Sequence, residues 1–318
     1  MLEPVGFDDQ PGVTVIIPVH HAGTTLRASV ESALSQRRID MSVVIALHGS
    51  DTETREVAMS FEHLQDVTTI DVPKSATDRT TPAYPLNEAL RVLSEASSFG
   101  STASWIFRLD ADDFYANELA IRNCLDAGGR KPWISGLCVP FNPVTRDAYV
   151  LGPREEYRTV DALRQRGGTY TLAHASNAMR EDLILRLLQI TCTPFDENVD
   201  FGEDLVLSSQ LLRLTKEIDF RFVEQVLYYK AVRETSLTSS LSTYGNLRSH
   251  YFLSRLCPEL RFRQLAVGVL ELWLQRFMSE RRARCFVDQY VSYNGYLRDY
   301  EYDEVQLRLI ELNHPLAH

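Results

Sequence analysis

The first third of the chain alternates short apolar runs with segments whose apolar residues recur at helical spacing. The runs are rich in β-branched or aromatic residues, as is typical of strands buried in a parallel sheet. They lie at residues 13–19, 42–47, 67–72 and 104–109. The segments with helical spacing follow the first three runs, at 24–36, 53–63 and 86–96. This order predicts an α/β fold in which a mainly parallel sheet carries helices on both faces.

Beyond residue 113 the regular alternation gives way to a mixed pattern. Paired apolar runs at 134–140 and 148–151 predict a hairpin, with Asn142 and Pro143 in its loop. Two short strands are expected at 218–223 and 226–230. Helices are expected at 116–127, 160–166, 180–188 and 204–214. This half completes a mixed sheet, so we expect a main domain over residues 1–243.

The remaining residues, 244–318, carry dense apolar positions separated by Arg and Glu. Helices are expected at 244–256, 262–285 and 304–312. This pattern predicts a helical C-terminal extension that docks on the main domain. It could shape a substrate site or form a homodimer contact, and the pattern does not decide between the two.

The charge balance is acidic, with 33 Lys and Arg against 43 Asp and Glu. It argues against broad nucleic-acid binding, which needs a basic face that displaces counterions. The five cysteines are far apart and form no CxxC pair, so neither a disulfide framework nor a structural zinc site is expected. No basic leader is visible, and no apolar run of the tail approaches the ~20 residues of a membrane span. We therefore expect a soluble, cytoplasmic protein with reduced thiols.

The densest group of carboxylates follows the fourth apolar run. Asp110, Asp112 and Asp113 lie within four residues of one another. Their mutual repulsion is unfavourable unless a cation or hydrogen-bond donors offset it. Mg²⁺ commonly joins one or two carboxylates to substrate phosphates, and ligands bind at the carboxyl ends of parallel strands. The group predicts a metal site, although Asp113 alone could instead cap the next helix.

Two further groups of residues are candidates for a functional site only in combination with the first. Glu203 and Asp204 follow a glycine at the start of an expected helix, which capping and favourable charge at a helix N-terminus would explain. Pro18 is expected to end strand pairing. Because neighbours on an extended chain point in opposite directions, His20 is a candidate ligand contact and His21 is expected to be exposed.

The three groups occur in the order and spacing of a known family. VTVIIPVHH and LRASVESALSQ resemble the opening strand and helix of the family-2 glycosyltransferases of the GT-A fold, and RLDADDFYANELA resembles their DXD motif. FDENVDFGEDLVLSSQLL is similar to their acceptor-side Glu-Asp motif, and YYKAVRETSLTSS to their late strand and Ser-rich segment. The resemblance covers residues 13–240 and implies a nucleotide-sugar half over about 13–115 and an acceptor half over 116–243.

The resemblance implies a metal-dependent, inverting transfer of sugar from a nucleotide-diphosphate sugar, with a UDP-sugar as the expected donor and Mn²⁺ or Mg²⁺ as the cofactor. Asp112 would be the main metal ligand, Asp110 would contact the ribose or the metal through water, and Asp113 would support these ligands from behind or face the sugar. Asp204 would be the general base, with Glu203 as the second candidate or a binder of sugar hydroxyls. Further donor contacts are implied at Pro18, Val19, His20, His48, Arg79, Asn87 and Arg233.

Three departures from the family pattern affect the donor site. The second strand ends in Ala46-Leu47-His48-Gly49-Ser50 and lacks the usual carboxylate for the base, so His48 is expected to contact or stack on the base instead. Asn87 lacks its usual basic partner, which Arg79 could replace. A metal-ligating His after the late strand is absent, and Lys230 or Arg233 could neutralise the diphosphate directly.

Two other functions remain open. A sugar-nucleotide nucleotidyltransferase would need a Gly-rich, basic phosphate loop after the first strand, and HHAGTTLR does not supply one. A non-catalytic module that binds nucleotide-sugars or a partner would fit the departures, but not the retention of both acidic groups. The acceptor is expected to be soluble: a small molecule, a glycan precursor or a protein, bearing a hydroxyl or amine.

Overall fold

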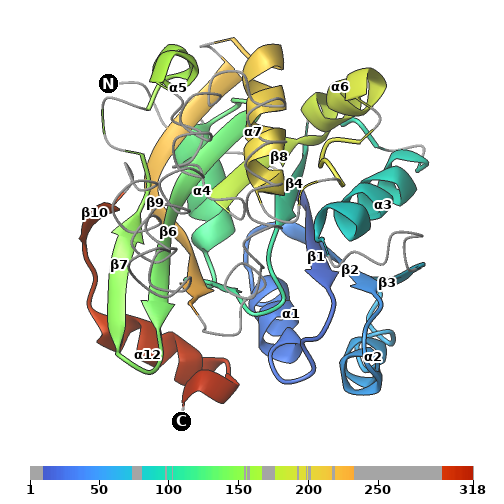
Figure 1. Cartoon of the computed structure of the whole chain (residues 1–318), viewed down its shortest axis with the longest axis vertical. Helices are drawn as coiled ribbons and strands as arrows, with labels where there is room; N and C mark the ends of the chain where they lie inside the picture. Colours follow the sequence, from blue (N-terminus) through green and yellow to red (C-terminus); the bar gives the residue numbers. More distant parts are fainter. Residues whose placement is uncertain are drawn as a thin grey trace, which may run out of the picture.

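The computed structural model describes most of the chain outside residues 233–295. The described ranges are 10–73, 81–96, 99–101, 103–153, 155, 158–166, 176–191, 193–197, 199, 202–216, 219–232 and 296–317. Within them, ten strands form one sheet whose main path runs β10-β7-β6-β8-β4-β1-β2-β3, while β9 pairs with β6 and with β5. Figure 1 shows this twisted sheet with helices on both faces, which confirms the predicted fold class.

The nucleotide-binding half expected from the sequence is a set of parallel strands. β1 (Gly12–Val19) lies between β2 (Asp40–His48) and β4 (Ser104–Arg108), and β3 (Val67–Val72) pairs with the far side of β2. All these pairings are parallel, so the carboxyl ends of the four strands lie at one edge. The predicted runs therefore became strands within two residues of the expected bounds.

Alternate residues of these strands bury their side chains on opposite faces. Val15 and Ile17 pack in one apolar cluster, and Ile16 and Val44 pack in the other. The first cluster is covered by α1 (Leu26–Leu34), α2 (Thr52–Met59) and α4 (Ala120–Gly128). The second cluster is covered by α3 (Ala83–Ser94), α6 (Glu181–Thr191) and α7 (Glu203–Leu214). Burial on both faces explains why the strands read as continuous apolar runs.

The second half continues the sheet with antiparallel pairs. β6 (Trp133–Asn142) and β7 (Asp147–Leu151) form the predicted hairpin, and α5 (Val160–Arg166) has its predicted bounds. The strands expected at 218–223 and 226–230 are one strand, β9 (Phe220–Ala231). The residues between them stay in the strand because the pairing with β6 shifts register near Gly136. Two short strands were not predicted, β5 (Phe114–Tyr115) and β8 (Asn177–Arg180).

The expectation that Pro18 ends strand pairing is wrong. Pro18 lies inside β1 opposite Ala46 of β2. The carbonyl of Ile16 accepts the N–H of Leu109 from the β4 side, so the backbone of Pro18, two residues later, faces the same side. β4 has already ended there, and the missing N–H of proline therefore removes no ladder hydrogen bond.

The end of the chain joins the sheet instead of forming only helices. β10 (Tyr296–Asp299) pairs antiparallel with β7, and α12 (Tyr302–Glu311) confirms the helix expected at 304–312. The helices expected at 244–256 and 262–285 lie outside the described residues. Val305 and Leu309 of α12 are fully buried in a cluster with Phe114 of β5, so α12 packs directly against the strand that follows the acidic group.

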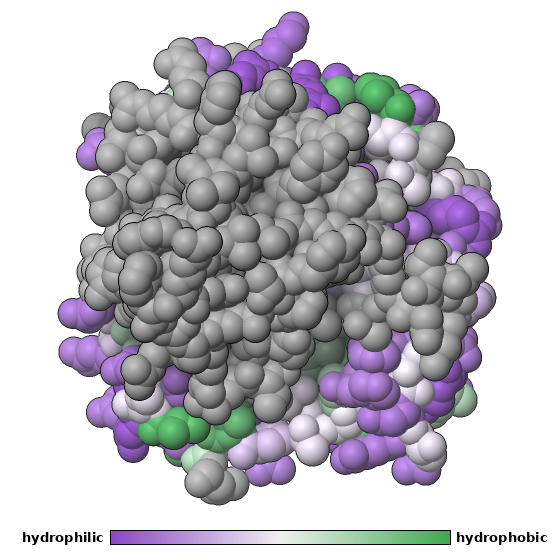
Figure 2. All heavy atoms as spheres, in the orientation of Figure 1, coloured by the Kyte–Doolittle hydropathy of each residue, from purple (hydrophilic) through white to green (hydrophobic). Residues whose placement is uncertain are grey.

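Within the described ranges, no helix has both the length and the apolar character needed to cross a bilayer. Figure 2 shows mainly hydrophilic side chains over the described part of one face, with a hydrophobic patch near α6. Ile190 of α6 is 65% exposed, and single exposed apolar residues of this kind are ordinary. Of the cysteines, Cys124 and Cys138 are described, and both are buried free thiols, as expected.

Arg308 fastens α12 to the sheet, and its removal should destabilise the whole domain. Arg308 is buried, and its guanidinium donates to the carbonyl of Tyr115 at 3.2 Å and to the hydroxyl of Ser35 at 3.3 Å. Arg308→Met leaves both acceptors without this donor, so we expect a loss of about 2 kcal/mol in the free energy of unfolding, measured with urea. Glu311→Gln, which removes only the exposed partner of Arg308, should stay within about 0.5 kcal/mol of wild type. Equal stability of Arg308→Met and wild type would contradict this role.

Candidate functional site

The candidate site lies at the edge where the four parallel strands end. β1 is followed by His20, β2 by Gly49 and Ser50, and β4 by the acidic group that starts at Asp110. β3 ends one residue after Asp71. Because adjacent strands are about 4.8 Å apart, these residues form one continuous row. Ligands of open parallel sheets bind at this kind of edge.

A buried arginine joins the two acidic groups. Arg108 is the last residue of β4, and its side chain is only 5% exposed. Its Nε and Nη2 both lie 3.0 Å from Oδ1 of Asp110, and its Nη1 lies 2.8 Å from Oε1 of Glu203. Residues almost a hundred positions apart in the sequence are thus held together by one guanidinium.

The charge of Arg108 is fixed by these neighbours. Burial alone would lower the pKa of Arg108, but Asp110, Glu203 and Asp204 outweigh that effect, and the pKa is raised. The guanidinium therefore stays charged at any physiological pH. The sequence analysis did not single out Arg108, although a lone basic residue inside an apolar strand signals a buried charge that needs partners.

Asp113 connects the acidic turn to the late strand. It is 2% exposed, its Oδ1 accepts the N–H of Ala231 at 3.1 Å, and its own N–H donates to the carbonyl of Asp110. Lys230 lies beside these carboxylates. Burial lowers the pKa of Lys230, but Asp113 and Asp110 outweigh this, and its pKa is raised. The structure thus places Asp113 as a support of the turn and Lys230 as a cation next to it, whereas Asp112 is partly exposed.

Asp204 and Glu203 begin α7 in different environments. Gly202 precedes them with φ of 80°, a left-handed conformation that favours glycine and turns the chain into the helix. Glu203 is buried against Arg108, whereas Asp204 is partly exposed and accepts the N–H of Leu205 with its Oδ1 at 3.0 Å. The pair is therefore divided into one buried carboxylate and one accessible carboxylate.

The histidines at the strand ends contact one another. His20 donates from Nδ1 to the carbonyl of His48 at 2.7 Å, which leaves Nε2 of a neutral ring as an acceptor. His48 is 5% exposed, and its ring packs edge-on against Tyr84. His21 is exposed, as expected, and pairs with Asp51. Its ring lies 3.9 Å from that of His20, so the expectation of opposite directions is wrong, because the chain bends after Val19 and is no longer extended.

Other predicted donor contacts are occupied within the protein or lie outside the described residues. The amide of Asn87 donates to the carbonyl of Phe195 at 2.7 Å and to Glu197 at 3.0 Å, and its oxygen accepts the N–H of Phe195. Asn87 thereby fastens α3 to residues 195–197. Val19 is buried, and its carbonyl accepts the hydroxyl of Ser50 at 3.2 Å. Arg79 and Arg233 lie outside the described residues.

The predicted metal ligands are suited to a hard cation that substrate phosphates help to hold. Within the described ranges, no group of three or more His, Cys, Asp or Glu is arranged around a metal position. Asp112 is partly exposed, and the side chain of Asp110 is 27% exposed with one oxygen engaged by Arg108. Mg²⁺ is commonly held by one or two carboxylates together with water and phosphate oxygens. The residues present therefore fit such an ion.

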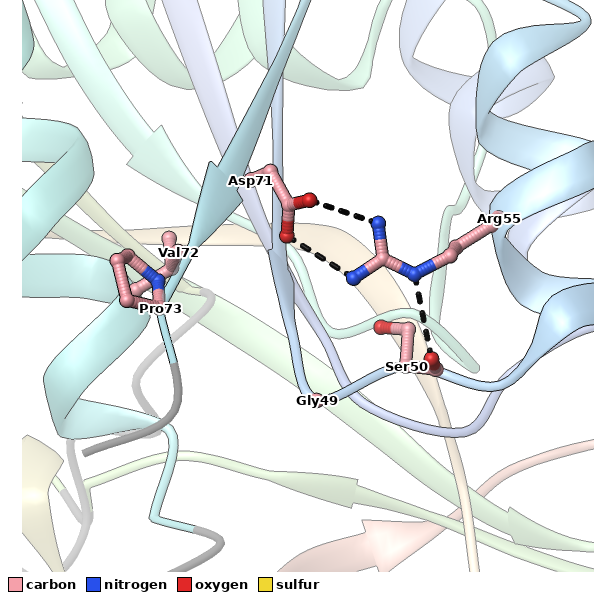
Figure 3. A pocket seen from close by; sticks show the side chains of 6 residues that line it. All are labelled: Gly49, Ser50, Arg55, Asp71, Val72 and Pro73. Atoms are coloured by element: carbon pink, nitrogen blue, oxygen red, sulfur yellow. Dashed lines mark hydrogen bonds and ion pairs between the residues drawn. The ribbon is translucent and has the colours of Figure 1, made fainter. Parts of the chain in front are cut away.

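A pocket opens beside the ends of β2 and β3 (Figure 3). It has a volume of about 450 Å³. Arg55 of α2 crosses the space between the two strand ends and pairs with Asp71. None of the pocket's charged residues was singled out in the sequence, because a lone Arg on a helix and a lone Asp in a strand have no spacing that links them. The pocket is lined by Gly49, Ser50, Arg55, Asp71, Val72 and Pro73.

Comparison with known proteins gave matches to one family model and to solved structures. The family model for glycosyl transferase family 2 matches residues 14–186, more than half of the chain. No curated protein sequence matches significantly. The fold is similar to residues 1–349 of S. aureus TarS in complex with UDP-GlcNAc, with TM-score 0.58 and 15% identity over 95% of this chain and 80% of that one. It is also similar to the mannosyltransferase PcManGT from Pyrobaculum calidifontis in complex with GDP-Man and Mn²⁺, with TM-score 0.52 and 16% identity over 96% of this chain and 81% of that one.

Removal of the Arg108 charge should lower the free energy of unfolding, because Asp110 and Glu203 then lack their cation. Arg108→Met keeps most of the volume but leaves Asp110 and Glu203 without their cation, so we expect a loss of about 3 kcal/mol in the free energy of unfolding. The double variant Arg108→Met/Glu203→Met should recover part of that loss, because the buried carboxylate is then gone. Strictly additive effects in this double-mutant cycle, measured by urea unfolding, would show that the ion pair is not coupled.

Proposed function

The chain belongs to glycosyl transferase family 2 and is a glycosyltransferase, and we propose that it transfers a sugar from a nucleotide-diphosphate sugar to an acceptor hydroxyl or amine, with inversion and with a divalent metal. The observation that carries this proposal is the Arg108 bridge. It brings the donor-side carboxylate Asp110 and the helix that begins with Glu203 and Asp204 to the same edge of the sheet. A transferase needs donor and acceptor groups in one place, and this bridge supplies that proximity.

The nucleotide-sugar lies across the strand ends in this proposal. The parallel half, residues 13–115, holds the donor, and residues 116–243 supply the acceptor side. Asp110 contacts either the ribose or, through water, the metal, and Nε2 of His20 is available as an acceptor at the end of β1. We retain a UDP-sugar as the expected donor. Solved structures with the same fold hold UDP-GlcNAc and GDP-Man, which supports a nucleotide-sugar without deciding between the bases.

Asp112 and Asp110 are the residues proposed to hold Mn²⁺ or Mg²⁺. The ion, when bound, offsets the negative charge that develops on the departing nucleoside diphosphate. The mannosyltransferase of similar fold was solved with Mn²⁺, which supports use of such an ion. Lys230, whose pKa is raised beside Asp110 and Asp113, adds a fixed positive charge behind the turn. Arg108 keeps one oxygen of Asp110 in place.

Asp204 is the proposed general base. Its carboxylate is partly exposed at the start of α7, whereas Glu203 is buried and shares its charge with Arg108. A buried carboxylate that is held by a guanidinium is less accessible to an acceptor than a partly exposed one, and a general base must come within hydrogen-bond reach of the proton it removes. Asp204 would remove the proton from the acceptor as the acceptor oxygen or nitrogen attacks the anomeric carbon. One such displacement inverts that carbon. The acceptor proposed here is a small molecule, a glycan precursor or a protein.

Asp112→Asn should weaken nucleotide binding only when the metal ion is present. We expect UDP affinity in the presence of Mn²⁺ to fall by at least about tenfold, because a neutral amide is a weaker ligand for a hard cation than a carboxylate. With EDTA, wild type and variant should bind UDP equally. Asp40→Asn, at an exposed residue on the opposite edge of the sheet, is the matched control and should not change binding. Equal affinity of wild type and Asp112→Asn in Mn²⁺, measured by calorimetry, would remove Asp112 from the metal site.

Asp204→Asn should separate turnover from donor binding. Loss of a general base lowers kcat by about 10² or more, whereas the affinity for the donor should be unchanged because the side chain acts on the acceptor. Release of the nucleoside diphosphate in the presence of acceptor gives kcat, and calorimetry gives donor affinity. A matching loss of donor affinity would instead make Asp204 a cap of α7.

A further inference from the structure

The chain bends directly after β1 and brings two histidine rings together. His20 and His21 follow Val19, the last residue of β1, and the centroids of their rings lie 3.9 Å apart at an interplanar angle of 47°. His20 is partly buried, whereas the side chain of His21 is 54% exposed. The two rings therefore form a close pair that a ligand from solvent can reach.

Each of the two rings is held through the same nitrogen, Nδ1. Nδ1 of His20 lies 2.7 Å from the carbonyl oxygen of His48, and Nδ1 of His21 lies 3.0 Å from Oδ2 of Asp51. A carbonyl oxygen and an ionised carboxylate can only accept a hydrogen bond, so Nδ1 carries the proton in both rings. Nε2 of each neutral ring then holds a lone pair that can bind a ligand.

The two acceptors are themselves fixed by the fold. The carbonyl of His48 lies at the end of β2, which pairs with β1 through the last residue of β1. Asp51 is the N-cap of α2, and its Oδ1 accepts the N–H of Thr54 at 2.8 Å. Hydrogen bonds from Thr54 hold the pKa of Asp51 below its usual value, so Oδ2 stays an acceptor for His21. The orientations of both imidazoles are therefore set before any ligand binds.

Histidines that bind metal ions show this same pattern of hydrogen bonds. A ligating histidine almost always donates its other ring N–H to a carbonyl, a carboxylate or water, which fixes the tautomer and raises the basicity of the ligating nitrogen. Imidazole nitrogen suits Zn²⁺, Cu²⁺ and Ni²⁺, whereas Mg²⁺ and Mn²⁺ prefer carboxylate oxygen. Two nitrogens on one zinc ion lie at most about 4.2 Å apart, twice the Zn–N distance of about 2.1 Å. Rings as close as those of His20 and His21 can therefore share one ion.

We propose that His20 and His21 bind one divalent cation of the Zn²⁺ class through their Nε2 atoms, at a site separate from the carboxylates of the acidic turn. Among the described residues, no group of three or more His, Cys, Asp or Glu forms a metal site, so water would supply the remaining ligands of a four-coordinate ion. The bound ion would occupy Nε2 of His20, which is otherwise available to the donor. Binding of the ion itself does not depend on the proposed function.

Calorimetric titration of the full chain with Zn²⁺, in excess Mg²⁺ to occupy the carboxylates, tests this site. Wild type should bind zinc saturably. His21→Gln removes one ligand at an exposed position and should lower the zinc affinity by at least about tenfold, the scale of losses in a metal site. Asp51→Asn keeps a good N-cap for α2, but its single amide oxygen cannot serve both Thr54 and His21. This variant should lower the zinc affinity by about tenfold through the loss of the orienting carboxylate.

Two control variants locate the bound ion. His63→Gln changes an exposed histidine beyond the far end of α2 and should bind zinc as wild type does. Asp112→Asn should also keep the zinc affinity, because its carboxylate belongs to the other proposed site. Absence of zinc binding by wild type, or equal zinc affinity of wild type and His21→Gln, would overturn the inference. A loss in Asp112→Asn that matches the loss in His21→Gln would place the ion in the acidic turn and would overturn it too. The titration contains no nucleotide, so a failure of the proposed function leaves its outcome unchanged.

Discussion

The burial of one guanidinium constrains how the two halves of this protein fit together. A charged group inside a fold is strongly unfavourable unless opposite charges surround it, and Arg108 at the end of β4 has Asp110 and Glu203 within 3.0 Å. Asp110 comes from the turn after β4 and Glu203 from the start of α7, and the guanidinium is paired with both. The start of α7 must therefore dock against the end of β4, so the acidic turn and the acidic helix end form a single site.

Around this ion pair, the remaining contacts act as supports of the same edge. The backbone of β9 is tied to the turn through Asp113 and Ala231, and α12 is tied to β5 through Arg308 and Tyr115. Asn87 joins α3 to the segment before α7. Each of these bonds joins two segments that are distant in the sequence, and so restricts their relative motion. A site that depends on distances between carboxylates benefits from such rigid support.

The sequence predicted most of the parallel half because its signals are local. Burial on both faces produces apolar runs such as 13–19, and helical spacing between them fixes the order of elements. The hydrophobic pattern was less informative where pairing partners are distant in the sequence. β5 and β8 are too short to show a period. β9 was predicted as two strands because the residues near Gln225 face solvent. Within the site, the acidic residues were found from their density. Arg108 and the Arg55–Asp71 pair were not, because their meaning depends on residues that only the fold brings close.

Glu203 and Asp204 show why two adjacent carboxylates need not share a role. The first turn of a helix points neighbouring side chains about 100° apart, so only one of them can face the buried guanidinium. Glu203 faces it and has a structural role, since its charge pairs with Arg108. Its neighbour Asp204, at the same helix N-terminus, is partly exposed and therefore accessible to an external partner. In the proposed reaction, the buried carboxylate holds the geometry and the accessible one would exchange a proton, and the direction of α7 is what separates them.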